Sequence, residues 1–388
     1  MRPPSRARVF CLFVCLVAIA LSSEAIAQTA DTKSASIPML DLEQQSDRKR
    51  LSAEIVTVDR EAKQYLGHPT TCLLEDGQTI LCVYPKGHGR GPIVYKRSND
   101  GGRTWSDRLP TPESWKTSKE TPTLHRVIGP DGARRVIMFS GLYPIRMAIS
   151  EDNGDSWSEL KKVGDYGGIV AMSSVFKIKT GAGHYMAMFH DDGRFYSAAR
   201  KQEKPVRFSV YKIRSEDGGM TWSTPTTVVS SNAKHLCEPG IIRSPNGKQI
   251  ACLLRENSRK HPSQIIFSND EGETWGKARD LPSPLWGDRH TAKYLPDGRL
   301  FISLRCNHPR NGKSHPFQGD WVAWVGTYED LVAEKQGQFL IRLQNNTKAA
   351  DCAYPGVEAL EDGTIVTTTY GHWEDGESPF ILCVRLKL

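Results

Sequence analysis

One eight-residue motif occurs four times in this chain and limits its fold more than any other feature. Copies with the pattern S-x-D-x-G-x-(S/T)-W occupy residues 98–105, 150–157, 215–222 and 268–275. In such a segment the Ser and Asp side chains bond nearby backbone amides, and the glycine takes a positive φ. The tryptophan then covers the apolar face of the next strand. We therefore interpret each copy as a hairpin corner within a repeated β unit.

A second repeat, of predicted β-hairpins, occurs six times. Each hairpin joins two short apolar runs through a polar turn, and Asp-Gly or Asn-Gly turns of this kind are the strongest short-range hairpin signal. The six hairpins span residues 73–84, 127–140, 175–190, 241–255, 292–305 and 357–370. After each of the first four, a further strand leads into a corner motif. The unit therefore has four strands in roughly 50 to 65 residues, which is typical of a propeller blade.

The two ends of the repeat array predict how the ring closes. Residues 326–330 form a degenerate corner in the fifth unit, and residues 380–388 supply a late strand to the sixth. Residues 53–59 form a lone strand that can complete the sixth blade. An open solenoid or a stack of separate domains is the alternative, but neither explains a single strand at each end. We predict an all-β, six-bladed β-propeller over residues 52–388.

The first 27 residues have the features of a secretory signal peptide. Arg2, Arg6 and Arg8 precede an apolar run, and small residues then lead to a predicted cleavage after Ala27. The run is short for a membrane span, and no lipid-attachment pattern follows it. We therefore expect a secreted or periplasmic protein without a membrane anchor, and a polar, flexible leader over residues 28–51.

Charge and cysteine usage restrict the partners. The formal net charge of +7 is spread along the chain without a dense Lys/Arg block, which argues against nucleic-acid binding and allows a modest preference for anions. Seven cysteines follow the signal segment, and their spacing is not typical of metal ligands. We expect buried free thiols, with a Cys72–Cys82 disulfide as the alternative. We also expect a monomer that needs no metal or other cofactor.

Chemically active residues recur where the predicted hairpins begin and end. In a propeller the first strand of each blade lines the axis, and the loops at one end of the axis converge. Charged groups are costly to place there unless they are paired or solvated, so a purely structural axis needs few of them. The positions include His68, Glu120, Glu238, Arg289 and Tyr354 before hairpins, and His88, Arg90, Asp191, Asp192, Arg255 and Arg305 after them.

The corner motifs resemble the Asp boxes of the sialidases, a family of six-bladed propellers. The resemblance covers nearly all of the chain after the leader and implies that fold, although such boxes also occur in proteins with other functions. Glu238 is similar to the family's Asn-Glu-Pro glutamate, and Tyr354 is similar to its nucleophilic tyrosine. Arg255 and Arg305 end the fourth and fifth hairpins, where the family has substrate-binding arginines.

Physical chemistry supports this set of residues. A sugar with a carboxylate on its anomeric carbon repels a carboxylate nucleophile, so a neutral tyrosine is the better attacking group. Because an ordinary tyrosine has a pKa of about 10, it needs a base, which Glu238 would supply. Arg255 and Arg305 would hold the substrate carboxylate through paired hydrogen bonds.

The sequence departs from the sialidase pattern in the first blade. Gly67-His68-Pro69 stands where the family has Arg-Ile-Pro, and the loop over residues 85–91 contains no carboxylate to act as acid/base. His88 is a candidate for that proton transfer, and Lys86 or Arg90 for the lost carboxylate contact. Alternatively, Asp191 or Asp192 supplies the proton from the third blade. We place His68 and Arg289 among the substrate-binding residues as well.

The favoured interpretation is an exo-acting glycoside hydrolase of the sialidase type that removes a terminal acidic sugar, sialic acid or a related one. A hydrolase for another acidic or uronate-linked sugar, with histidine as acid/base, is one alternative. A non-catalytic carbohydrate-binding propeller is the other.

Overall fold

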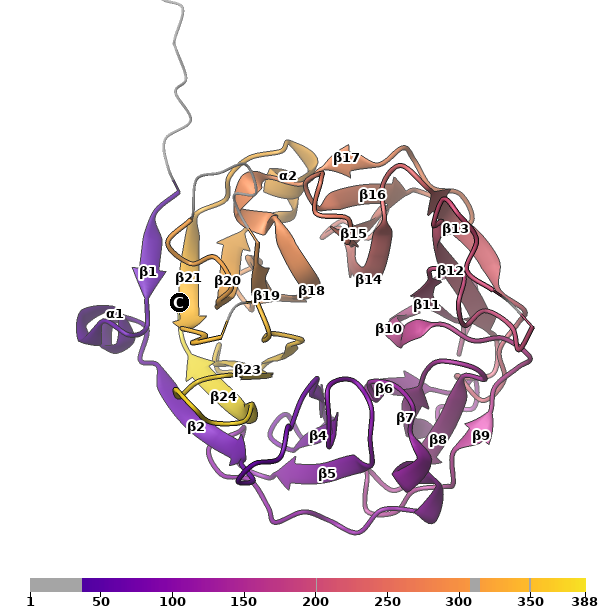
Figure 1. Cartoon of the computed structure of the whole chain (residues 1–388), viewed down its shortest axis with the longest axis horizontal. Helices are drawn as coiled ribbons and strands as arrows, with labels where there is room; N and C mark the ends of the chain where they lie inside the picture. Colours follow the sequence, from indigo (N-terminus) through magenta and orange to yellow (C-terminus); the bar gives the residue numbers. More distant parts are fainter. Residues whose placement is uncertain (1–36, 200, 308–314, 349) are drawn as a thin grey trace, which may run out of the picture. The chain divides into compact units, whose positions relative to one another are not determined.

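Six β-sheets surround one central axis in the computed structural model (Figure 1). The structure describes residues 37–388 other than 200, 308–314 and 349. The expected signal peptide and residues 28–36 of the expected leader lie outside the described residues. All six predicted hairpins form, and each one joins the two innermost strands of its own sheet. The prediction of an all-β, six-bladed propeller is confirmed.

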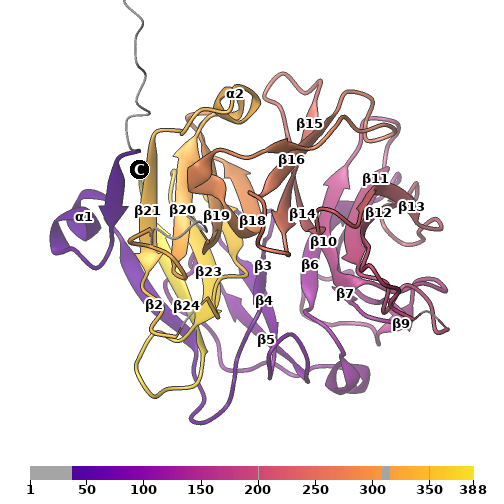
Figure 2. The same cartoon turned by 45° about the horizontal axis from the view of Figure 1, so that its top comes forward.

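The strands follow one another outward from the axis in each blade, as the tilted view in Figure 2 also shows. Blade 1 has β3 (Thr70–Leu73), β4 (Ile80–Pro85) and β5 (Ile93–Ser98), and blade 2 has β6 (Thr123–Ile128), β7 (Arg134–Ser140), β8 (Arg146–Ser150) and β9 (Lys161–Lys162). Blade 3 has β10 (Ile169–Lys177), β11 (Tyr185–Asp191), β12 (Phe208–Ser215) and β13 (Thr226–Ser231). Blade 4 has β14 (Leu236–Arg243), β15 (Ile250–Glu256), β16 (Gln264–Ser268) and β17 (Arg279–Asp280).

Blades 5 and 6 contain both ends of the described chain. Blade 5 has β18 (Gly287–Tyr294), β19 (Leu300–Cys306), β20 (Trp321–Gly326) and β21 (Phe339–Gln344), with β1 (Met39–Asp41) outside them. Blade 6 has β22 (Gly356–Ala359), β23 (Ile365–Gly371) and β24 (Phe380–Leu386), with β2 (Glu54–Asp59) outside them. β2 pairs antiparallel with β24, so that Glu54 lies opposite Arg385. The predicted closure of the ring by the two lone strands is therefore confirmed.

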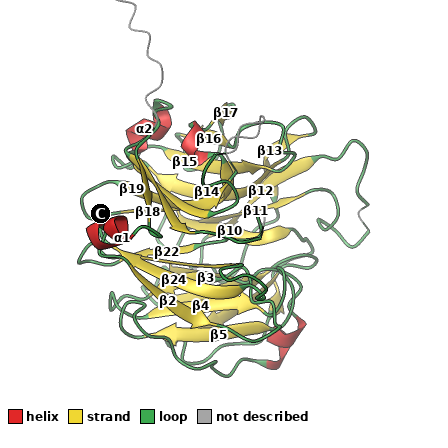
Figure 3. Cartoon of the chain, turned by 60° about the vertical axis from the view of Figure 1, so that its left-hand side comes forward, coloured by secondary structure: helices red, strands yellow, loops and turns green. Residues whose placement is uncertain are grey.

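The leader prediction fails from residue 37 onward. β1 adds to the edge of blade 5 in parallel with β21, and Met39 lies opposite Leu340. Leu40 and Leu42 become buried there, because alternate side chains of a strand face the same side. The short helix α1 (Gln45–Arg50) follows on the outside of the ring, where Figure 3 shows it in red.

Blade 1 contains three strands in the described structure, where the sequence predicted four. The segment after its corner runs beside β5, and the Leu109 amide donates to the Tyr95 carbonyl over 2.9 Å. Pro110 and Pro112 then follow, and neither has an N–H to continue the ladder. Helix η1 (Glu113–Thr117) takes the place of the missing strand and buries Trp115.

The four corner motifs have the predicted geometry. In the third, the Gly219 amide donates to Ser215 Oγ over 2.8 Å, and the Thr221 amide donates to Asp217 Oδ1 over 3.0 Å. The glycine lies against the preceding blade, because a Cβ on Gly219 would approach Ile137 within 3.2 Å. The corners therefore also join neighbouring blades. The degenerate corner of blade 5 differs: its Thr327 caps helix α2 (Tyr328–Val332).

Hydrogen bonds near the axis join the blades as well. Thr70, Ser174 and Thr291 each donate a side-chain hydroxyl to the carbonyl of a proline at the start of the next blade, over 3.1, 2.7 and 2.9 Å. Buried hydrophobic clusters fill the spaces between the sheets. Among the described residues, no helix is long and apolar enough to cross a membrane.

All seven described cysteines are buried, and none is joined to another by a disulfide. The alternative Cys72–Cys82 disulfide does not form, for a reason of register. Cys72 lies opposite Leu81, and Cys82 lies opposite Thr71. Because neighbouring positions on a strand point to opposite faces, the two thiols cannot meet.

Candidate active site

A shared backbone irregularity turns functional side chains toward one end of the axis. His68, Val170, Glu238, Arg289 and Ala353 have φ values between 49° and 56°, and each lies at or just before the start of an innermost strand. The pairing register shifts at this point in β10, β14 and β18. Left-handed backbone is costly for residues other than glycine and is concentrated at functional sites, as are β-bulges. The irregularity marks this end of the propeller as the candidate site.

A cavity of about 360 Å³ opens at this end. That volume lies near the lower limit of ligand sites and suits one sugar unit. Its polar lining comes from blades 1, 2, 3, 4 and 6 and includes His68, His88, Arg90, Glu120, His190, Asp192, Arg194, Glu238, Arg255 and Tyr354.

Tyr354, Glu238 and Arg255 form a hydrogen-bonded triangle in this cavity. The Tyr354 hydroxyl donates to Glu238 Oε1 over 2.5 Å. Arg255 Nη1 donates to the same carboxylate oxygen over 2.6 Å and to the Tyr354 hydroxyl oxygen over 2.9 Å. The three residues come from blades 6 and 4, which lie on either side of blade 5. The structure thus brings together three residues that the sequence analysis selected.

Burial and charge decide the protonation states within the triangle. Burial would raise the pKa of Glu238, but the attraction of Arg255 and the hydrogen bond from Tyr354, with a smaller contribution from His190, together hold this pKa below its ordinary value. Burial raises the pKa of Tyr354, and the negative charge of Glu238 raises it further. The resting site therefore pairs a neutral phenol with an ionised carboxylate, which is the arrangement that a base and its nucleophile require.

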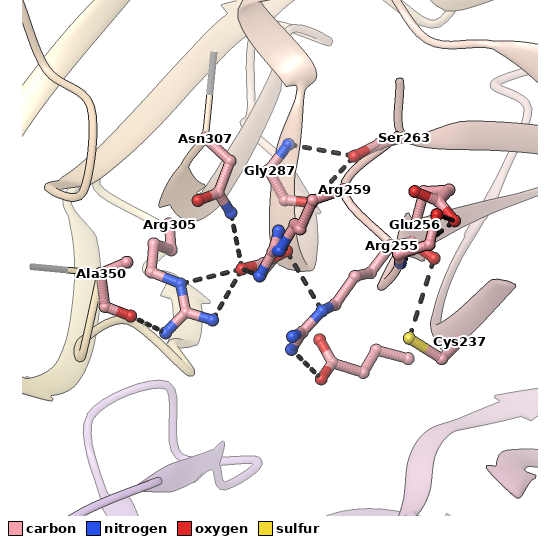
Figure 4. Close-up of polar contacts among 12 residues, drawn as sticks. Cys237, Arg255, Glu256, Arg259, Ser263, Gly287, Arg305, Asn307 and Ala350 are labelled. Atoms are coloured by element: carbon pink, nitrogen blue, oxygen red, sulfur yellow. Dashed lines mark hydrogen bonds and ion pairs between the residues drawn. The ribbon is translucent and has the colours of Figure 1, made fainter. Parts of the chain in front are cut away.

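Asp288 lies behind the triangle, where several nearby arginines bind its carboxylate. The carboxylate is fully buried and accepts hydrogen bonds from Arg305 Nη2 over 2.6 Å and from Asn307 Nδ2 over 2.6 Å. Arg259 binds both carboxylate oxygens, and Arg255 Nε lies 3.2 Å from Oδ1. Figure 4 shows the side chains of Arg255, Arg259, Arg305 and Asn307 converging from different strands and loops. Burial opposes ionisation of Asp288, but Arg255 and Arg305 hold its pKa well below the usual range.

Two arginines predicted to bind substrate lie outside this cavity's lining. Arg305 is 6% exposed, and its Nη1 donates to the carbonyls of Ala350 and Cys352. Arg289 lines a separate cavity of about 310 Å³ within the central channel. The sequence correctly placed Arg289 near the start of the fifth hairpin and Arg305 at its end, but it did not predict which way the side chains point.

His88 belongs to a second polar cluster at the mouth. Its Nδ1 lies 2.7 Å from the Tyr65 hydroxyl oxygen. Tyr65 donates its single proton to Asp351 Oδ1 over 2.8 Å, so Nδ1 of His88 must carry the proton in the contact between them. Nε2 is then the nitrogen that can exchange a proton with a ligand. His372 Nε2 lies 3.0 Å from the other oxygen of Asp351.

The carboxylate of Asp351 is suited to remain charged. Burial would raise its pKa, but the contacts with His88, Tyr65 and His372 hold the pKa well below its ordinary value. Asp351 therefore cannot donate the proton that the missing first-blade aspartate would have supplied. It instead places a fixed negative charge 3.5 Å from His88 Nδ1.

The remaining predicted residues differ in their roles. His68 accepts the Gly89 amide proton on Nδ1 over 3.1 Å, and burial holds its pKa well below the usual value, so it is neutral. Asp191 is buried and binds the amides of Gly193 and Phe195, which indicates a role in shaping that loop.

The lining cations differ in how fully they are paired. Asp192 lines the cavity but pairs with Arg194, whose Nε lies 2.8 Å from Oδ1. The Arg90 guanidinium has no hydrogen bond or ion pair within the part of the chain that the structure describes. It is also exposed, so it is available to an anionic ligand. Glu120 is buried beside this loop, and burial raises its pKa.

Sequence reasoning missed Tyr65, Asp288 and Asp351. Asp288 immediately precedes Arg289, and Asp351 lies three positions before Tyr354, so both are neighbours of selected positions. The bulges bring consecutive residues to the mouth, so a direct neighbour of a selected residue can also belong to the site. Among the described residues, no group of three or more His, Cys, Asp or Glu side chains is arranged to hold a metal ion.

Comparison with known proteins gives a consistent result. Residues 139–366, more than half of the chain, match the family described as BNR repeat-like domain. The chain is similar to a sialidase of Paraclostridium sordellii, with 26% identity over 208 residues that cover 48% of this chain and 50% of that protein. The chain spans about half the length of the curated relatives that it matches.

Solved structures share the fold. A protein of unknown function from Dyadobacter fermentans matches with a TM-score of 0.66 and 18% identity, over 86% of this chain and 98% of that one. The intramolecular trans-sialidase of Ruminococcus gnavus, in complex with oseltamivir carboxylate, matches with a TM-score of 0.57 and 14% identity, over 87% and 97%. At such identities the likeness establishes the propeller fold.

Proposed function

This chain belongs to the BNR repeat-like family and is a propeller of the sialidase superfamily, and from that premise we propose that it is a retaining, exo-acting glycoside hydrolase for a terminal acidic sugar. The observation that carries the proposal is the buried triangle of Tyr354, Glu238 and Arg255 at a cavity of one-sugar size. A phenol that donates to an ionised carboxylate is ready to lose its proton as it attacks.

In the first step, the Tyr354 oxygen forms a bond to the anomeric carbon while the bond to the leaving oxygen breaks. The Tyr354 proton passes to Glu238 over the 2.5 Å contact. Protonated His88 gives its Nε2 proton to the leaving oxygen. Arg255 remains bonded to Glu238 and Tyr354 and stabilises the charge that moves between them.

In the second step, water attacks the glycosyl-tyrosine on the face that the leaving group vacated. His88 takes a proton from this water, and Glu238 returns its proton to Tyr354 as the bond between tyrosine and sugar breaks. Two inversions give net retention at the anomeric carbon. The sum of both steps is glycoside plus water giving free sugar plus alcohol.

An acidic substrate is favoured by the charges around the cavity. Arg90 is exposed at the mouth, and Arg194 lines the wall from blade 3. Guanidinium groups bind carboxylates through paired hydrogen bonds. The small cavity suits a terminal residue rather than the middle of a chain, which supports exo action.

The proposal is tested by incubating the purified protein with aryl glycosides of acidic sugars, including an aryl α-sialoside and aryl uronides of both anomers. We expect release of the aryl group, with a product of retained configuration in a proton NMR time course. A first-formed product of inverted configuration would rule out the tyrosine intermediate. Absence of release from the whole panel, by protein that melts cooperatively, would contradict the hydrolase proposal.

A further inference from the structure

The arginines below Tyr354 already hold a carboxylate that belongs to the protein. Arg305 binds Asp288 through Nε over 2.9 Å and through Nη2 over 2.6 Å. Arg259 binds both oxygens of Asp288, and Asn307 adds a further hydrogen bond over 2.6 Å. Asp288 has no exposed surface. Figure 4 shows Arg259, Arg305 and Asn307 extending toward one region from different directions. Their hydrogen bonds place the carboxylate of Asp288 there, so it is enclosed.

Most donors of the two arginines expected to bind substrate are correspondingly occupied, and of their nitrogens only Nη2 of Arg255 lacks any partner among the described residues. Arg305 uses Nη1 on the carbonyls of Ala350 and Cys352 and its other nitrogens on Asp288. Arg255 uses Nη1 on Glu238 and Tyr354, and its Nε faces Asp288 at 3.2 Å. A guanidinium group presents five N–H donors in a fixed plane, so these contacts also fix its orientation.

A carboxylate on the anomeric carbon would have to enter this neighbourhood. Such a group lies one bond from the carbon that the Tyr354 oxygen attacks. It would therefore lie near Arg255, Glu238 and Asp288, two of which are carboxylates. The paired donors of Arg259 and Arg305 face Asp288, so these two arginines offer a second carboxylate no bidentate site.

The geometry points to a substrate whose anomeric carbon carries hydrogen in place of a carboxylate, with Asp288 as the built-in counter-ion of the arginine cluster. The preferred substrates are aldosides, and the acidic group that Arg90 favours lies elsewhere on the ring, as in a uronide. This inference rests on the proposed hydrolase function for its substrate, but its charge argument depends only on Asp288 and the arginines.

A tyrosine nucleophile remains appropriate for such a substrate. Glu238 and Asp288 already place two negative charges beside the attacking position. A carboxylate nucleophile would add a third, whereas Tyr354 is neutral at rest. Glu238 and Asp288 would thus repel a carboxylate nucleophile, just as the carboxylate of a sugar with an anomeric carboxylate would repel it.

The first experiment measures ligand binding by the full chain, without relying on turnover. We expect calorimetry to show no saturation by 2-deoxy-2,3-dehydro-N-acetylneuraminic acid, a sugar with a carboxylate at the anomeric position, up to about 1 mM, a Kd typical of weak binding. We expect kcat/KM for aryl uronides to exceed that for an aryl α-sialoside by at least about 100-fold. Micromolar binding of the inhibitor, or preference for the sialoside, would overturn the inference.

The second experiment removes the internal carboxylate. In Asp288→Ala, the arginines lose their counter-ion, and we expect acetate to raise the melting temperature of the variant more than sodium chloride at equal ionic strength does. The wild type should respond equally to the two salts. Asp320→Ala, which removes a buried aspartate that pairs with Arg342 in another part of blade 5, is the matched control. Equal responses of Asp288→Ala to both salts would contradict a carboxylate-binding cluster.

The outcomes separate this inference from the proposed function. Hydrolysis of the sialoside together with tight inhibitor binding would overturn the inference and leave the hydrolase intact. Absence of hydrolysis of every glycoside, together with acetate rescue, would overturn the hydrolase and leave the assignment of Asp288 standing. If Asp288→Ala does not fold, the calorimetry of the wild type decides the question alone.

Discussion

The hydroxyl of Tyr354 lies 2.5 Å from Oε1 of Glu238, although 116 positions separate the two residues in the sequence. The contact joins blade 6 to blade 4, on either side of blade 5. It exists because both residues occupy the same point of the repeat, at the start of an innermost strand. Repetition of one structural unit thus creates a site from residues that are distant in the chain.

Replacing Tyr354 with phenylalanine removes the nucleophile but keeps the ring that packs against His68. We expect kcat for the best aryl glycoside to fall by at least about 10³-fold, because no other group that hydrogen-bonds to Glu238 can act as a nucleophile. Binding of the sugar product should change little. Initial rates and calorimetry measure the two effects separately.

Tyr294→Phe is the matched control, because its hydroxyl donates to the Arg243 carbonyl and lies outside the lining of the mouth cavity. This variant should retain wild-type kcat. If Tyr354→Phe is as active as Tyr294→Phe, the nucleophile assignment is wrong.

The hairpins and corners were predictable because both are local. An Asp-Gly turn or a Ser/Asp/Trp corner is built from residues within a few positions of one another, such as Ser215 and Gly219. The absence of a fourth strand in blade 1 was also predictable locally, because Pro110 and Pro112 cannot donate backbone hydrogen bonds to a neighbouring strand. The regular four-strand repeat nevertheless led to the prediction of a fourth strand there. β1 was missed because a three-residue strand with one buried leucine is too short for periodicity to reveal.

The site was only partly predictable, for a different reason. Family resemblance and repeat position selected Glu238, Arg255 and Tyr354, which meet. Position alone did not reveal that Arg305 is committed to Asp288, because that depends on side-chain direction at a β-bulge. The contacts of His88, the proposed acid/base, likewise involve Tyr65 and Asp351, which are 286 positions apart in the chain. No local pattern connects such a pair.

Arg255 should control the acidic limb of the pH profile. Burial tends to raise the pKa of Glu238, and Arg255 is the strongest of the groups that together hold it below the ordinary value. Because catalysis needs ionised Glu238, we expect wild-type kcat/KM to persist down to a pH below about 4.3, the ordinary glutamate pKa. In Arg255→Met, burial raises the pKa of Glu238 without opposition from the Arg255 charge. The pH at which kcat/KM falls on the acidic side should therefore rise by at least about one pH unit.

Arg255→Lys keeps the positive charge and serves as the control. Its acidic limb should lie closer to that of the wild type, even if kcat falls through lost geometry. An acidic limb that does not move in Arg255→Met would show that another group governs it.

His190 should make folding stability dependent on pH. The ring is buried and accepts the Glu238 amide proton on Nδ1, and burial lowers its pKa to about 4. The unfolded chain binds a proton near pH 6.5, so the unfolded state holds more protons between these values. The contribution of neutral His190 to the free energy of unfolding is therefore fully present above about pH 6.5. It declines by up to about 3 kcal/mol as the pH falls toward 4.

His190→Asn retains an acceptor for the Glu238 amide but does not titrate. We expect the variant to lose less stability than the wild type between about pH 7 and 4.5, as measured by urea unfolding at each pH. Equal losses in the two proteins would contradict a buried neutral histidine at this position.

The corner motifs should contribute to stability without contributing to catalysis. Ser215, which begins the third corner, lies opposite Tyr185, whereas the mouth residue His190 lies at the other end of the same strand. The Asp217 carboxylate accepts the Met220 and Thr221 amides over 3.0 Å each. Asp217→Ala leaves these donors without their partner, and we expect the free energy of unfolding to fall by about 1–3 kcal/mol.

Glu216→Ala, in the same corner, is the matched control, because none of the corner's hydrogen bonds involves its side chain. It should change the free energy of unfolding by no more than about 0.5 kcal/mol. Both variants should keep wild-type kcat per folded molecule, since the corner and the mouth lie at opposite ends of blade 3. A selective loss of kcat in Asp217→Ala, at a temperature where the variant is fully folded, would show that the corner transmits an effect along the blade to the site.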